Sequence, residues 1–128
     1  MNIEFLYSKN EDRLIEIVNI NGDESVSISG FERLVPNTVD AAKEKHVPVI
    51  RLEDDNILYI QVGEVLHPMT SDHLISKLYI VTDKGDLIKK VLTDTDKPEL
   101  TVDIKDAKKV DVYAYCNLHG LWKTSIEI

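Results

Sequence analysis

The segment YCNLHGLW places Cys116, the only cysteine of the chain, three residues before His119. A thiolate and an imidazole are both strong ligands for first-row transition metals. Three further histidines, His46, His67 and His73, stand in the segments EKHVP, LHPM and SDHLI. Any one histidine is more often a surface or structural residue than a ligand. Taken together, the four imidazoles and the single thiol form a complete candidate set of metal ligands.

Three metals could use such a set. Structural zinc takes four ligands and is commonly held by Cys-x-x-Cys pairs, which this chain lacks. Blue copper takes two histidines, one cysteine and a weak axial methionine, but Met69 follows His67 and not Cys116. Five nitrogen and sulfur ligands suit a five-coordinate iron with an open sixth position, and a thiolate would push electron density onto that metal. The residues favour iron and leave a copper electron-transfer protein as the alternative.

The elements that must position these ligands are strands. From Val47 onward apolar and polar residues alternate with a period of two, and short segments rich in Asp, Asn, Gly and Pro interrupt the pattern. The expected strands are VPVIRL, NILYIQV, LISKLYIV, DLIKKVL, ELTVDI, KVDVYAYC and LWKTSIEI. Seven short strands at this spacing predict an all-β fold, an antiparallel β-sandwich. The histidines lie at strand ends or in loops, which can converge at one end of a sandwich.

Residues 1–36 form a smaller region that we interpret as a separate β domain, with residues 37–128 as the sandwich domain. NIEFLY, RLIEIVNI and SVSISGF are predicted strands, and NGDE is a predicted tight turn. A unit this small rarely stands alone without a metal, a disulfide or a partner. We therefore expect it to pack on the main domain or on a second subunit. In the connector VPNTVDAAKEK we expect one helical turn over TVDAAK.

The composition excludes several classes of function. The chain has 128 residues, is 43% hydrophobic and carries a net charge of −8, with no run of Lys and Arg. Binding to nucleic acid or to an anionic membrane needs a basic surface, so we expect neither. The N-terminus does not resemble a signal peptide, and one cysteine cannot form an internal disulfide. These features predict a cytoplasmic protein.

Three segments, EKHVPVI, VGEVLHPMTSDHLI and YCNLHGLW, resemble those of the superoxide reductase family, also called desulfoferrodoxin and neelaredoxin. The resemblance covers residues 37–128 and implies an immunoglobulin-like sandwich. It implies one mononuclear iron per chain, with His46, His67, His73 and His119 as equatorial ligands and Cys116 as the axial ligand. The implied reaction is reduction of superoxide anion to hydrogen peroxide, with electrons from a small donor protein such as rubredoxin.

The connector also resembles the two-domain members of this family, whose N-terminal domain is like desulforedoxin and binds iron through four cysteines. Where those members carry their cysteine pairs, this chain has YSKNEDR and SISGF. A second iron centre held by four cysteines is therefore not expected, and the chain is similar to the class that keeps the small domain without its cysteines. A homodimer is expected from family habit and from a small metal-free domain that needs a partner.

Two charged residues directly precede His46. The resemblance implies that Lys45 attracts the anionic substrate and that Glu44 caps the open iron position after oxidation. The net charge of −8 repels an anion, so a local cation near the metal has a physical purpose. Without the resemblance, the pair would be interpreted as a solvated charged turn. We also expect the backbone N–H groups of Leu118 and His119 to bond the sulfur of Cys116.

Overall fold

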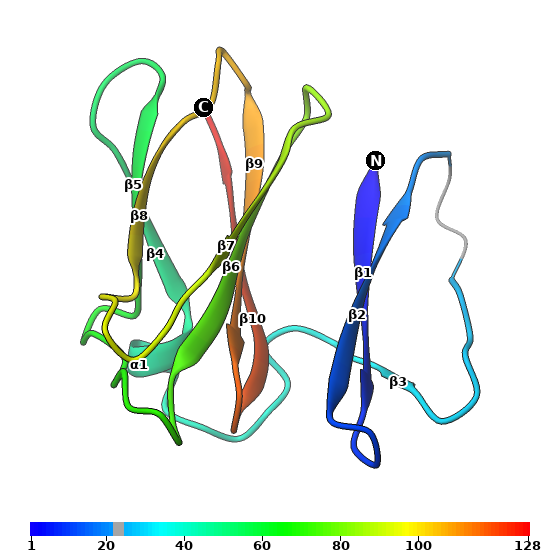
Figure 1. Cartoon of the computed structure of the whole chain (residues 1–128). Helices are drawn as coiled ribbons and strands as arrows, with labels where there is room; N and C mark the ends of the chain where they lie inside the picture. The colour runs from blue at the N-terminus through cyan, green and yellow to red at the C-terminus, as the bar shows by residue number, and fades with distance from the viewer. Residues whose placement is uncertain (22–24) are drawn as a thin grey trace. The chain divides into compact units, whose positions relative to one another are not determined.

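The computed structural model describes residues 1–21 and 25–128 and divides into two compact units, Met1–Val35 and Pro36–Ile128 (Figure 1). Most of the predicted NGDE turn falls on residues 22–24, outside the described residues. Within the described part, no helix is long and apolar enough to cross a membrane. The division falls next to the predicted domain boundary, and the nature of the first unit stays a prediction.

The first unit is a small antiparallel sheet. Its strands are β1 (Asn2–Ser8), β2 (Arg13–Asn19) and β3 (Glu32–Arg33), in the order β2-β1-β3. β1 and β2 form a hairpin that pairs Asn2 with Asn19 at one end and Ser8 with Arg13 at the other. The first two predicted strands of this region are therefore confirmed.

The predicted strand over SVSISGF is wrong. The described chain from Ser25 to Phe31 forms no strand, and the pairing on this side of β1 is limited to the two residues of β3. The backbone N–H of Val26 donates to the carboxylate of Glu4 (3.2 Å), and the chain then turns at Gly30, whose φ is +84°. Because the backbone bonds a side chain here, the alternating Val26 and Ile28 do not join a ladder, and each stays 37% exposed.

The second unit is the predicted antiparallel sandwich. Strands β10 (Gly120–Glu127), β9 (Lys109–Cys116), β6 (Ile75–Thr82) and β7 (Leu87–Val91) form one sheet in that order. Strands β4 (Pro48–Leu52), β5 (Ile57–Val62) and β8 (Glu99–Asp103) form the other. All seven predicted strands of this region are confirmed, with ends that differ by at most one residue. The core lies between the sheets and is built from the inward-facing residues predicted by alternation, among them Leu58, Ile60, Val110, Val112 and Ala114.

The helical turn lies later than expected. Helix α1 spans Lys43–His46 and is closed by a hydrogen bond from the Val47 N–H to the Lys43 carbonyl (3.0 Å). The predicted turn over TVDAAK is wrong, because Asn37, whose φ is +64°, turns the chain and bonds the edge of β10. Its side chain and backbone exchange bonds with Leu121 and Lys123. Val47 leaves the helix in an extended conformation, as the residue before a proline usually does.

Candidate metal centre

The sheet registers bring all five candidate ligands to one end of the sandwich. The start of β4 pairs with the end of β5 through Pro48 and Val62, so α1 and the loop after β5 meet there. At the same end Cys116, the last residue of β9, pairs with Ile75 of β6 and with Gly120 of β10. Figure 1 shows α1 at this end. The ligands themselves come from α1 (His46), from the β5–β6 loop (His67 and His73), from the end of β9 (Cys116) and from the β9–β10 turn (His119).

Four of the five residues form one tight group. One ligand atom from each of His46, His67, His73 and Cys116 lies within 4.8 Å of the others. His119 adjoins this group, with its Nδ1 3.0 Å from His46 Nε2 and 3.9 Å from Cys116 Sγ. Two nitrogens that bind one metal at about 2.1 Å and at right angles lie about 3.0 Å apart. The separation between His46 and His119 therefore has the size expected of neighbouring ligands.

The facing nitrogens of His46 and His67 cannot be explained as a hydrogen bond between neutral rings. Each ring places its Nδ1 2.7 Å from a backbone carbonyl, that of Ala42 for His46 and that of Pro68 for His67. A carbonyl only accepts, so Nδ1 carries the proton in both rings and each Nε2 presents a bare lone pair. These two Nε2 atoms lie 3.2 Å apart. Two lone pairs at this distance repel unless a cation lies between them.

His73 and Cys116 add donors to the same space. The Nε2 of His73 is buried and has no hydrogen-bond partner among the described residues. Such an orphaned nitrogen is uncommon in a folded protein and calls for an unseen partner. The Sγ of Cys116 lies 3.5 Å from His67 Nε2, and the residue is fully buried. The residues present thus fit a metal ion, and the donor set of imidazoles and one thiol suits a transition metal.

Burial controls the protonation of the ligands. It lowers the pKa of His67 to about 4 and also lowers the pKa of His46, so both rings are neutral at pH 7. Burial raises the pKa of the Cys116 thiol, and backbone N–H groups of Leu118 and His119 oppose that rise. These are the two N–H groups that we expected to act on the sulfur. A metal ion that binds here would find both imidazoles already neutral and able to coordinate. It would have to displace only the proton of the Cys116 thiol.

Several groups that hold the ligands escaped the sequence analysis. The side chain of Asn117 accepts from the Leu74 N–H (3.0 Å) and donates to the Asp72 carbonyl (3.0 Å). It thereby ties the Cys116 end of β9 to both neighbours of His73. Trp122 donates from Nε1 to the His119 carbonyl (3.1 Å), and its ring lies 4.9 Å from that of His46. Asparagine next to the cysteine was a possible signal, whereas carbonyl partners carry none in the sequence.

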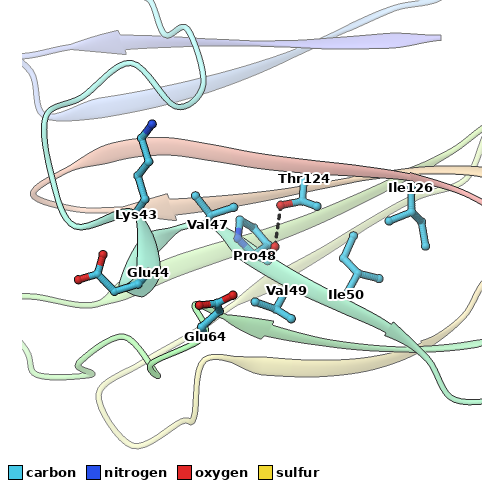
Figure 2. A pocket seen from close by; sticks show the side chains of 9 residues that line it. All are labelled: Lys43, Glu44, Val47, Pro48, Val49, Ile50, Glu64, Thr124 and Ile126. Carbon is cyan, nitrogen blue, oxygen red and sulfur yellow. Dashed lines mark hydrogen bonds between the residues drawn. The ribbon is translucent and has the colours of Figure 1, made fainter.

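Glu44 and Lys45 lie in α1, directly before His46, and both are exposed. Neither is part of the four-residue ligand group. Figure 2 shows Glu44 and Lys43 projecting from α1. Both residues line a cavity of about 590 Å³. Val47, Pro48 and Ile126 contribute to the apolar wall of that cavity. Their placement leaves the predicted roles of Glu44 and Lys45 as proposals.

Known proteins share both the sequence and the fold. The family model described as Desulfoferrodoxin matches residues 38–125. Desulfoferrodoxin of Clostridium acetobutylicum is 40% identical over 121 residues, which are 93% of each chain. Desulfoferrodoxin of Nitratidesulfovibrio vulgaris is 41% identical over 111 residues, 86% of each chain. The crystal structure of the superoxide reductase from Treponema pallidum superposes with a TM-score of 0.75 at 29% identity, covering 97% of this chain and 99% of that one. Since the match takes in every strand that carries a candidate ligand, this chain belongs to the desulfoferrodoxin family.

Proposed function

We propose that this chain is a superoxide reductase in which His46, His67, His73, His119 and Cys116 hold one mononuclear non-haem iron. The observation that carries the proposal is the pair of bare Nε2 lone pairs of His46 and His67, fixed 3.2 Å apart by carbonyls behind each ring. Family membership supplies the reaction class. The four convergent imidazoles exceed the two of a blue-copper site, which favours iron over the copper alternative.

When bound, iron supplies one electron to superoxide, and with two protons this yields hydrogen peroxide. The residues define the side from which substrate arrives. Cys116 is fully buried, whereas His73 and His119 are partly exposed. Superoxide would therefore approach from the side of His73 and His119 and not from that of the buried thiol. The N–H groups of Leu118 and His119 hold the sulfur and moderate the electron density that it donates.

Lys45 is the proposed steering residue. Its exposed ammonium follows Glu44 in α1 and precedes the ligand His46. The chain carries a net charge of −8, so a local cation at the mouth of the site favours approach of an anion. Glu44 is proposed to cap the open position after the metal is oxidised, for which its exposed side chain would have to turn toward the ligand group.

The electron donor and the assembly are also proposals. A small redox protein such as rubredoxin would return the electron, and the protein would act in the cytoplasm. We propose that residues 1–36 are a desulforedoxin-like domain without metal ligands and that residues 37–128 are the catalytic domain. A homodimer is supported by the exposed apolar residues of the first unit, including Val18 (41%) and Ile20 (80%). Sedimentation at several protein concentrations tests the dimer.

The test of the function combines metal content with product yield. Protein purified without added metal should hold one iron per chain and no copper. Mixed with superoxide and excess reductant, it should form one hydrogen peroxide for each superoxide consumed. Dismutation would form half as much, together with oxygen. Stoichiometric copper, or a peroxide yield of one half, would overturn the proposal.

A further inference from the structure

Gly63 stands directly after β5, four residues before the candidate ligand His67. Its φ is +102°, a conformation that side-chain-bearing residues rarely adopt. A Cβ added to it would lie 2.3 Å from the carbonyl oxygen of Glu44 and 2.6 Å from both the Cα and the carbonyl carbon of Lys45. These are backbone atoms of α1, which cannot rotate away as the end of a long side chain would. Gly63 thus lies in direct contact with the turn that carries His46.

Hydrogen bonds hold the two backbones together at this contact. The Val65 N–H donates to the Glu44 carbonyl (3.0 Å). On the other side, Gln61 donates from Nε2 to the Gly63 carbonyl (2.9 Å) and fixes the orientation of that peptide group. The same loop then closes on itself through the His67 N–H and the Val62 carbonyl (2.8 Å). Two ligand-bearing segments are therefore joined through one residue without a side chain.

We propose that Gly63 is a positioning residue for the metal centre, because the absence of a Cβ sets the distance between the segments that carry His46 and His67. The Nε2 atoms of these rings lie only 3.2 Å apart, so a displacement of α1 by the width of a methyl group would separate them. The inference deepens the proposed function and rests on it only for the presence of a metal. It requires nothing of the reaction itself.

Positive φ alone does not account for this position. Gly85 has a φ of +83° in the β6–β7 turn, and nothing lies within 4 Å of a Cβ built on it. Alanine would be strained at both positions, but only at Gly63 would its methyl group also collide with backbone. Gly85→Ala is therefore a matched control: it carries the cost of placing alanine at a positive φ, but its methyl group does not collide with backbone.

The experiment titrates metal-free protein with Co²⁺, and separately with Fe²⁺ under anaerobic conditions. Wild type, Gly63→Ala, Gly85→Ala and the milder Gln61→Leu are compared. The dissociation constant is measured together with the visible absorption of the Co²⁺ form, which reports coordination number and thiolate bonding. Circular dichroism of each metal-free variant reports whether the sandwich has formed.

Gly63→Ala should fold, bind metal about ten- to a hundredfold more weakly and show a changed Co²⁺ spectrum, the size of effect usual when a group that orients a ligand is altered. Gly85→Ala should match wild type in both readouts, and Gln61→Leu should change the spectrum in the same sense but less. Wild-type affinity and spectrum in Gly63→Ala would overturn the inference. So would a Gly63→Ala variant that fails to fold while Gly85→Ala folds, since Gly63 would then serve folding and not positioning. A wild-type protein that binds neither metal would instead overturn the proposed function.

Discussion

Two strands of this molecule end in the same way and lead to different chemistry. β1 ends at Ser8, whose buried hydroxyl accepts the N–H of Glu11, three residues on (3.3 Å). β9 ends at Cys116, where burial raises the pKa of the thiol and the N–H groups of Leu118 and His119, the second of which is also three residues on, lower it. Each turn thus offers backbone donors to a buried oxygen or sulfur atom.

The surroundings separate the two turns. Four imidazoles converge beside Cys116, and the Nε2 lone pairs of two of them, His46 and His67, face each other at 3.2 Å. Around Ser8 the turn continues into the exposed residues Lys9, Asn10 and Glu11. Within the described chain, the only group of His, Cys, Asp or Glu residues arranged to hold a metal is the one at Cys116. A turn with N–H donors holds a ligand in place, but the converging donors from other loops make the site.

The substitution with the largest expected effect on metal binding is at Cys116. Cys116→Ser keeps the turn and removes the soft ligand, so metal affinity should fall by at least about a hundredfold, beyond the usual loss on altering an outer group. Ser8→Ala is the control and should keep full metal content. Titration of both metal-free variants with Fe²⁺ measures the difference. Equal affinity in Cys116→Ser and wild type would remove the thiol from the site.

The pH dependence of the metal-free protein sharpens the same comparison. The pKa of His67 is about 4 in the folded chain and about 6.5 when unfolded, so between these values the unfolded state binds the extra proton. The contribution of His67 to the free energy of unfolding is therefore fully present above about pH 6.5 and is lost as the pH falls toward 4. We expect a loss on the order of 1 to 2 kcal/mol between pH 7 and pH 5.

Urea denaturation of the metal-free protein at a series of pH values measures this loss. His67→Gln cannot titrate in that range and should flatten the slope over pH 7 to 5. His46, whose pKa is also lowered, would retain the remainder. Identical slopes in wild type and His67→Gln would show that the buried ring of His67 does not control the acid response.

A third prediction concerns the charge of Lys45, which directly precedes His46. Lys45→Ala should slow the second-order reaction with superoxide about three- to tenfold at low salt and flatten its dependence on ionic strength. Lys105→Ala removes the same charge from the β8–β9 turn, at the opposite end of the sandwich, and should change the rate little. Stopped-flow spectroscopy across a range of salt concentrations compares the two. An equal effect of both variants would mean that the reaction rate depends on the net charge of the protein and not on the position of Lys45.

Sequence reasoning succeeded where the information is carried by side-chain pattern. The alternation in KVDVYAYC predicted both β9 and the burial of its inward face, and five nitrogen and sulfur donors predicted a metal centre. The same reasoning failed at SVSISGF, where the alternation of Val26 and Ile28 is equally good. There the Glu4 carboxylate takes the Val26 N–H, a choice that depends on a residue 22 positions away.

Sequence reasoning could not predict the roles of backbone groups at the site, for a related reason. The carbonyls of Ala42 and Pro68 decide which nitrogen of His46 and His67 faces the candidate ligand group, but every residue has a carbonyl. The close approach of Gly63 to α1 likewise appears only after folding. The candidate ligands could be predicted from the chain, whereas their tautomers and spacing required the structure.

The smallest expected effect is the most specific test of what distinguishes the two turns. Ser8→Cys places a thiol at the end of β1, in a turn that already offers the Glu11 N–H. If a buried thiol in such a turn were enough to bind metal, this variant would gain a second ion per chain. We expect no gain, and a change in unfolding free energy within about 1 kcal/mol, because one hydrogen bond is exchanged for a weaker one. Metal analysis of the purified variant decides the matter: a second bound ion would show that converging ligands from other loops are dispensable, and an unchanged stoichiometry would leave them as the feature that makes Cys116 a metal ligand.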